Sequence, residues 1–212
     1  MEDVCTRLYL LRHGQVVNFS EGKYNGHRDV DITDIGVRQM EAMAKRLRNE
    51  HLAGVYCSDL LRAKRGAEII AAEHGLRPQA YSTLRELNIG RWEGLTPAET
   101  EEQFPGALDK RRKGLVDYRI PGGESLRDLS KRVLPALRGI LDVNRGGNVV
   151  LVAHGGVNRV ILADAMNLAL KYFYSIEQNY GCLNIIDYFT DCAVVKLMNA
   201  VEGSDIDNKA LA

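Results

Sequence analysis

Three short apolar runs constrain the fold of this chain more than any other feature of its sequence. They are RLYLL (residues 7–11), GVYCS (54–58) and NVVLVA (148–153), and polar residues or glycine bound each of them. Runs of this length and composition are typical of strands that are buried on both faces of a sheet. The sequence therefore predicts an inner sheet whose two faces are both covered.

Helical patterns follow the first two of these strands. Residues 33–50 carry apolar side chains at helical spacing, and the hydroxyl of Thr33 can cap the first turn. Residues 58–75 repeat the pattern, which Gly75 ends. The order strand, helix, strand, helix implies parallel strands with helices on both faces of the sheet.

Three further elements can be read from the remaining sequence. The segment TPAETEEQF predicts a short helix capped by Thr96. Residues 124–143 predict a long helix, which Pro135 should kink or divide. Residues 184–200 predict a closing hairpin that turns at residues 190–191.

Composition and charge exclude several classes of protein. Hydrophobic residues make up 45% of the 212, enough for one substantial domain. Lys+Arg and Asp+Glu both total 28, so bulk charge favours neither nucleic acid nor a membrane surface. The N-terminus does not resemble a signal peptide, and no apolar segment approaches the roughly 20 residues that span a bilayer. We expect a reduced, cytoplasmic protein whose four cysteines are small core residues: Cys5, Cys57, Cys182 and Cys192.

Charged and imidazole side chains follow the three apolar runs. Arg12 and His13 come directly after the first strand, Arg62 follows the second, and His154 follows the third. Ligands of open α/β sheets bind beyond the carboxyl ends of the parallel strands. The sequence therefore predicts that two histidines and two arginines converge at one edge of the sheet.

A histidine among arginines indicates chemistry on an anion, and phosphoryl is the anion that enzymes handle most often. Neutral imidazole is a good nucleophile near neutral pH, and the planar guanidinium matches phosphate oxygens. Phosphoryl transfer depends mainly on positioning and charge stabilisation. Arg12, Arg62 and a protonated His154 would supply that charge, so no metal or cofactor is expected to be required.

Five motifs, taken in their order along the chain, resemble those of the histidine phosphatase superfamily, which includes the cofactor-dependent phosphoglycerate mutases. They are RHG (12–14), YNGHRDVDITDIG (24–36), SDLLRA (58–63), LREL (84–87) and VAHGG (152–156). The resemblance implies a three-layer α/β/α sandwich with a mostly parallel central sheet, as in phosphoglycerate mutases. It implies one domain in residues 1–200, with an insert or lid at about 93–121 and a loose tail at 201–212.

The resemblance also implies roles for the residues at the sheet edge. His13 would be the nucleophile that becomes a phosphohistidine through Nε2. Arg12 and Arg62 would hold the phosphoryl oxygens, and His154 would stabilise their charge from the opposite side. Glu86, in LREL, would protonate the leaving alcohol and then take a proton from the attacking water.

Other positions are assigned to substrate binding by the same resemblance. Asn18 corresponds to the family's phosphate-contacting asparagine, although RHGQVVN places it one residue earlier than is common. Asn25 and Gly26 would line the pocket through backbone groups, or simply form a turn. Gly155, directly after His154, is also assigned to substrate binding.

The basic run Lys110, Arg111, Arg112 and Lys113 lies within the expected lid. Such runs are more often solvated faces than recognition sites. The alternative is that the run, together with Tyr118 and Arg119, contacts the group that the phosphate leaves.

The segments ELNIGRWEGLT and PGGES resemble the phosphatase branch, whereas mutases read ERHYG after the glutamate and have longer inserts. We therefore expect a phosphomonoester hydrolase that acts on a small phosphorylated metabolite. The pattern is similar to that of α-ribazole phosphatases of cobalamin synthesis, which makes α-ribazole 5′-phosphate one candidate substrate. The alternatives are a phosphoglycerate mutase and a phosphate-binding module without turnover.

Two other enzyme classes are excluded, and one assembly remains open. A tyrosine phosphatase would need five residues between cysteine and arginine, and Cys57 and Arg62 are separated by four. No GxxxxGK[ST] stretch of a P-loop enzyme exists in the chain. The closing edge strand could pair two copies as a homodimer.

Overall fold

The computed structural model describes residues 4–202 and contains one six-stranded sheet. The strands are β1 (Thr6–Arg12), β2 (Leu52–Ser58), β3 (Gln79–Tyr81), β4 (Asn148–Ala153), β5 (Leu183–Tyr188) and β6 (Ala193–Ala200). They lie in the order β3-β2-β4-β1-β5-β6. The four on one side pair in parallel, and the hairpin β5–β6 adds two antiparallel strands next to β1. The three predicted strands and the closing hairpin are confirmed.

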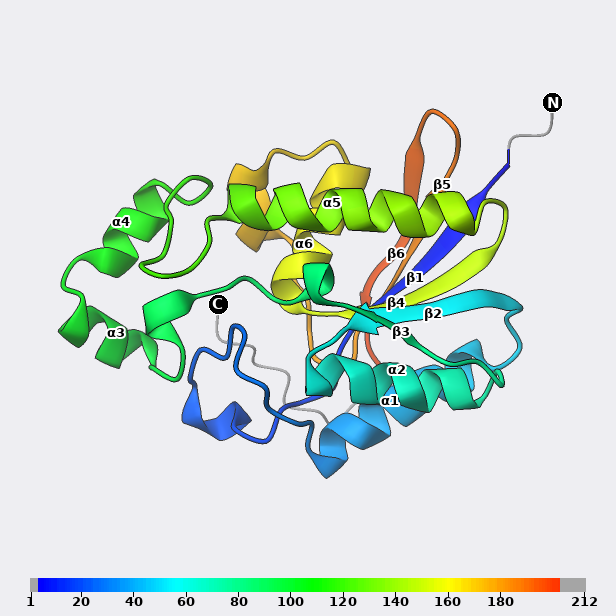
Figure 1. The fold of residues 1–212 in the computed structure, drawn as a ribbon, viewed down its shortest axis with the longest axis horizontal. Helices are drawn as coiled ribbons and strands as arrows, with labels where there is room; N and C mark the ends of the chain where they lie inside the picture. The colour runs from blue at the N-terminus through cyan, green and yellow to red at the C-terminus, as the bar shows by residue number, and fades with distance from the viewer. Residues whose placement is uncertain (1–3, 203–212) are drawn as a thin grey trace.

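Helices cover both faces of the sheet and give the molecule three layers (Figure 1). Helices α1 (Asp34–Leu47) and α2 (Leu61–Ala72) pack on one face, where Met40 and Ile70 are fully buried. Helices α5 (Leu126–Val143) and α6 (Gly155–Ala165) cover the other face, with Leu129 and Ile161 in its core. This is the α/β/α arrangement that the sequence predicted.

Helix caps form where the sequence placed them. The side chain of Thr33 accepts a hydrogen bond from Gly36 N at the start of α1, and Thr96 forms a capping box with Glu99. Pro135 does not divide α5, which runs unbroken over 18 residues, so that part of the prediction is wrong. Pro135 is exposed, and the carbonyl that loses its N–H partner there can be solvated.

A lid made of two short helices projects beyond the carboxyl ends of the strands (Figure 1). These are α3 (Pro97–Gln103) and α4 (Ala107–Lys113). Trp92 is fully buried beneath them and packs against Tyr24 on one side and Tyr118 on the other. The segments that flank the lid helices therefore pack against the loop that follows β1. Short 3-10 helices complete the fold: η1 (Phe19–Glu21), η2 (Ser82–Leu84), η3 (Gly90–Trp92) and η4 (Leu170–Ser175).

The expectations for the cysteines and the termini have mixed outcomes. Cys57 and Cys182 are buried, but Cys192 is exposed in the turn between β5 and β6, so the expectation of four core cysteines is wrong. Most of the predicted tail, residues 203–212, lies outside the described residues. Among the residues described, no helix has the length and apolar character of a membrane span.

Arg132 of α5 fixes the segment that contains the LREL motif. Its guanidinium donates to the main-chain carbonyls of Thr83, Arg85 and Glu86 at 2.7–2.8 Å. It also forms a two-point ion pair with Glu124 at 2.8 and 2.9 Å, and both side chains are about one-fifth exposed. Because buried carbonyls need donors, this one side chain determines how the segment lies against α5.

We expect Arg132→Met to lower the free energy of unfolding by about 2–3 kcal/mol, because it leaves three carbonyls and the Glu124 carboxylate without their donor. Urea denaturation measures this difference. Arg138→Met, at an exposed position of the same helix, is the matched control and should change stability little. Equal stability of the two variants would contradict the role given to Arg132.

Candidate active site

The carboxyl ends of the parallel strands bring the predicted residues together. β1 ends in Arg12 and leads into His13, and β4 leads into His154. Arg62 lies in the first turn of α2, after β2. The rings of His13 and His154 meet edge to face, with centroids 5.1 Å apart. The predicted convergence at the sheet edge is present.

Local geometry defines the tautomer of His13. Its Nδ1 lies 2.8 Å from the carbonyl oxygen of Gly14, and since a carbonyl can only accept, Nδ1 carries the proton. The lone pair of Nε2 is therefore free. A side chain at Gly14 would overlap the backbone of Gly36, which explains why glycine follows the histidine. Burial, with the charges of Arg62 and Arg12, lowers the pKa of His13 well below its usual value, so the ring is neutral at pH 7.

The two arginines are held by main-chain carbonyls rather than by carboxylates. Arg62, 2% exposed, donates to the carbonyls of Arg28 and Gly26, both at 2.7 Å. Burial lowers the pKa of Arg62 to about 10, and the group stays charged at neutral pH. Arg12 donates to the carbonyl of Gln178 at 2.6 Å, while its Nε is buried without a hydrogen-bond partner. Their charge is thus left available for an anion.

His154 is fully buried behind His13, and neither ring nitrogen has a hydrogen-bond partner. Burial, followed by the charges of Arg62, His13 and Arg12, lowers the pKa of His154 well below its usual value. The ring is neutral at pH 7, so the expectation of a protonated His154 is wrong for this arrangement. A buried imidazole without a partner can donate one N–H to an incoming oxygen.

Glu86 lies beside the start of α6. Its carboxylate accepts from Gly156 N at 3.0 Å and from Leu87 N at 2.8 Å. Backbone donors at a helix N-terminus favour a negative group, and they fix the direction in which the carboxyl points. Together with Arg132 behind the segment, they hold Glu86 on the wall of the cavity.

The assigned binding residues differ in where they lie. Asn18 and Asn25 pair reciprocally through their amides at 2.7 and 3.1 Å, and both line the cavity. Gly26 also lines it, with φ of +49° and its carbonyl bonded to Arg62. Gly155 is not part of the lining: it packs against Arg12, and the next residue, Gly156, forms the wall.

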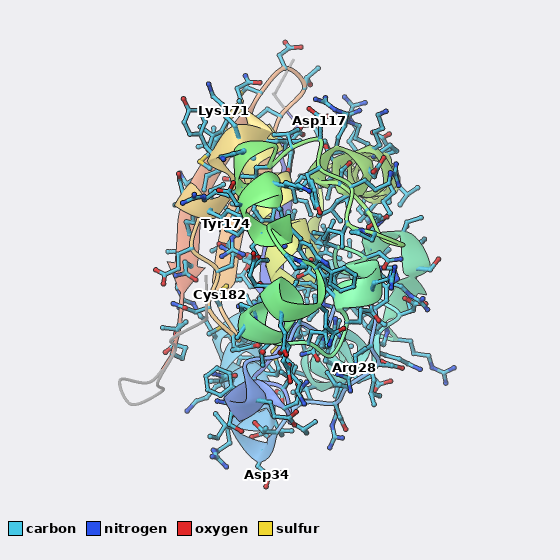
Figure 2. All side chains as sticks on the ribbon, turned by 90° about the vertical axis from the view of Figure 1, so that its left-hand side faces the viewer. Arg28, Asp34, Asp117, Lys171, Tyr174 and Cys182 are labelled. Atoms are coloured by element: carbon cyan, nitrogen blue, oxygen red, sulfur yellow. The ribbon has the colours of Figure 1, made fainter. Side chains whose placement is uncertain are left out.

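A cavity of about 270 Å³ opens above His13. Besides the predicted residues, its walls include Phe19, Tyr24, Phe173, Tyr174, Tyr180, Arg111 and Arg159. Figure 2 looks onto this end of the molecule, with Tyr174 and Arg28 on either side of the lid helices. The outer cavity is therefore aromatic and cationic, whereas its floor holds the histidines and arginines.

Tyr180 and Arg159 are among the cavity residues that the motifs missed, and Phe19, Phe173 and Tyr174 are others. Tyr180 lies in the loop before β5, where no pattern marks it. Arg159 lies in α6, a helix that the sequence patterns did not predict. Its place five residues after His154 was the only feature of the sequence that could have suggested a position near the site. Arg159 donates to the carbonyl of Ile176 at 2.7 Å and packs against the ring of Phe173.

The basic run of the lid divides into one inward and three outward side chains. Arg111 lines the cavity, with its guanidinium carbon 5.6 Å from the centre of the Trp92 ring. Arg112 and Lys113 pair with Asp109, and Lys110 is exposed. Neither of the other two candidates lines the cavity: Tyr118 packs against Trp92, and Arg119 pairs with Asp128.

Within residues 4–202, no three histidine, cysteine, aspartate or glutamate side chains are arranged to hold a metal ion.

Curated relatives match most of the chain. It is 38% identical over 190 residues to "Phosphoglycerate mutase-like protein 4" of Arabidopsis thaliana, covering 88% of this chain and 83% of the relative. It is 33% identical to "Probable phosphoglycerate mutase GpmB" of Yersinia pestis, covering 86% of this chain and 85% of that protein.

Solved structures show the same fold. The mycobacterial glucosyl-3-phosphoglycerate phosphatase Rv2419c superposes with a TM-score of 0.82 at 26% identity, covering 92% of this chain and 99% of the other. The alpha-ribazole phosphatase from Shigella flexneri gives 0.85 at 22% identity, covering 92% and 96%. Residues 8–201 match the sequence profile of the histidine phosphatase superfamily, branch 1. Since that match spans nearly the whole chain, the protein belongs to the histidine phosphatase superfamily.

Proposed function

We propose that the protein is a phosphomonoester hydrolase that works through a phosphohistidine on His13. The observation that carries this proposal is the free lone pair of a neutral His13 Nε2, at the floor of a cavity beside Arg12 and Arg62. Imidazole is nucleophilic only when it is neutral; burial, with the charges of Arg62 and Arg12, keeps His13 neutral, and the same two cations would attract the substrate's phosphate.

The reaction would proceed in two steps. In the first, Nε2 of His13 forms a bond to phosphorus as the bond to the leaving oxygen breaks, and Glu86, which enters this step protonated, gives that oxygen its proton and becomes a carboxylate. In the second, the Glu86 carboxylate takes a proton from water, the water oxygen bonds to phosphorus, and the bond to Nε2 breaks. Inorganic phosphate and neutral His13 remain. Arg12, Arg62 and an N–H of His154 would stabilise the transferring group throughout.

The outer cavity bears on the choice of substrate. Tyr24, Phe173 and Tyr174 offer ring faces to a leaving group, and Arg111 adds a cation from the lid. These walls favour a small metabolite with an apolar or ring-containing part, and α-ribazole 5′-phosphate is a candidate of this kind.

Two alternatives are kept. The names of the two relatives described above favour a phosphoglycerate mutase. The short lid opposes it, since a mutase must exclude water from the phosphohistidine. A phosphate-binding module without turnover is opposed by the complete set of nucleophile, cations and carboxyl group around one cavity.

Replacing the nucleophile tests the proposal directly. We expect His13→Ala to lower kcat for p-nitrophenyl phosphate by at least about 10³-fold, because it removes the proposed nucleophile from the floor of the cavity. Rapid-quench labelling of the wild type should trap phosphorus on His13. His51→Ala, at an exposed position, is the folded and active control.

Two outcomes would contradict this function. One is a wild type that hydrolyses no phosphomonoester, including α-ribazole 5′-phosphate, between pH 5 and 8. The other is isomerisation of 3-phosphoglycerate at a rate well above its hydrolysis, which would favour the mutase.

The lowered pKa of His13 predicts how activity depends on pH. As pH falls, kcat/KM should decrease only when His13 becomes protonated. Because the folded protein holds this pKa well below 6.5, that decrease should occur well below pH 6.5. The pH profile of kcat/KM for p-nitrophenyl phosphate measures it. An acidic limb centred at or above pH 6.5 would contradict the lowered pKa of His13.

Arg111 should affect substrate binding, unlike its neighbour. We expect Arg111→Ala to raise KM for p-nitrophenyl phosphate about fivefold, with kcat little changed, because it removes a cation from the outer wall. Arg112→Ala, whose guanidinium pairs outside the cavity with Asp109, should leave KM unaltered. Equal KM values for both variants would identify the whole run as a solvated face.

A further inference from the structure

Residues 176–182, between η4 and β5, form a loop that lies against the nucleophile, and we call it the 176–182 loop. Gly181 N donates to the carbonyl of His13 at 3.0 Å, and Arg12 N donates to the carbonyl of Cys182 at 3.1 Å. The carbonyl of Gln178 accepts from the Arg12 guanidinium at 2.6 Å. The loop thus contacts both the backbone and the side chain of the Arg12–His13 pair.

Tyr180 of this loop places its ring against both functional side chains. The guanidinium carbon of Arg12 lies 3.8 Å from the ring centre, and the rings of Tyr180 and His13 have centroids 5.6 Å apart. Phe19 also contacts the Tyr180 ring, edge to face at 82°. The N–H groups of a guanidinium lie in its own plane. A ring that packs against its face therefore limits the directions in which Arg12 can donate.

Two buried amides behind the ring hold the loop in place. Gln178 and Asn184 are fully buried and bond reciprocally: Gln178 Nε2 donates to Asn184 Oδ1 at 2.8 Å, and Asn184 Nδ2 donates to Gln178 Oε1 at 2.9 Å. Asn184 also donates to the carbonyl of Leu10 in β1 at 3.0 Å. Since an unpaired buried amide is costly, this cluster favours one arrangement of the loop.

Only some of the N–H donors of the Arg12 guanidinium form hydrogen bonds within the part of the protein that the structure describes. One nitrogen is bonded to the Gln178 carbonyl, and Nε is buried without a partner. Nε lies on the side of Gly155, whereas Arg12 as a residue lines the cavity above His13, so the terminal N–H groups that Gln178 does not use are the ones available to a phosphoryl oxygen. The ring of Tyr180 and the loop carbonyl together fix the direction of the remaining N–H groups.

We propose that Tyr180 is a positioning residue, whose ring fixes the plane of the Arg12 guanidinium so that its free N–H groups face the phosphoryl oxygens. This inference rests on the proposed function, because it assumes that Arg12 binds the transferring group. Tyr180 acts through Arg12 and takes no part in bond making.

Binding of orthovanadate, measured by calorimetry, tests this role separately from turnover. We expect Tyr180→Leu to raise the dissociation constant about tenfold, because the stacked ring is lost. Tyr180→Phe keeps the ring and should restore the affinity to within about twofold of the wild type. Tyr172→Leu, at an exposed position of η4 outside the cavity lining, is the matched control.

A double-mutant cycle distinguishes positioning from a merely structural role. In an Arg12→Lys background, which has no planar fork to orient, Tyr180→Leu should change vanadate affinity less than about twofold. A tenfold effect that persists there, or wild-type affinity in Tyr180→Leu, would overturn the inference. If the wild type binds vanadate but hydrolyses nothing, the proposed function fails while the cycle still tests Tyr180. A wild type that does not bind vanadate would overturn both.

Discussion

The parallel pairing of β1 with β4 in one register is the constraint on which the site depends. Arg12 lies opposite Ala153 at the end of both strands, so the residues that follow, His13 and His154, leave the sheet side by side. A shift of one residue would turn the side chains to the opposite faces of the sheet. The register is maintained by apolar side chains buried on both faces, which couples the position of two imidazoles to the packing of the whole core.

Unbalanced positive charge is the second property of the site. Arg12 and Arg62 are bound by carbonyls, which orient a guanidinium without neutralising it, and both histidines are neutral. Glu86 and Asp29 contribute negative charge near Arg62, but within residues 4–202 neither forms an ion pair with it, so an anion that enters the cavity can still pair with the guanidinium groups. Burial is the main cause of the lowered pKa of both histidines, and the charges of Arg62 and Arg12, which would also attract phosphate, add to it.

Sequence patterns predicted the parts of the fold and site that obey local rules. Apolar runs, caps and motifs located the strands, the first helices and the convergence of His13 with His154. Side-chain environments that depend on three-dimensional burial could not be predicted from the sequence. The protonation of His154 was misjudged because its complete burial is a property of the folded core, and Tyr180 was missed because an irregular loop leaves no periodic signal. The division of α5 at Pro135 was wrongly predicted, because an exposed helix face can tolerate a lost hydrogen bond.

The lid has a consequence for how such a protein can diversify. Trp92 and Tyr118, which flank the lid helices in sequence, pack together beside Tyr24, whereas most of the groups that would carry out the chemistry come from strand ends and the residues just after them. Insertions or exchanges within residues 97–113 can therefore reshape the entrance without disturbing the sheet register. One scaffold can in this way acquire new selectivity during evolution while its reactive centre stays constant.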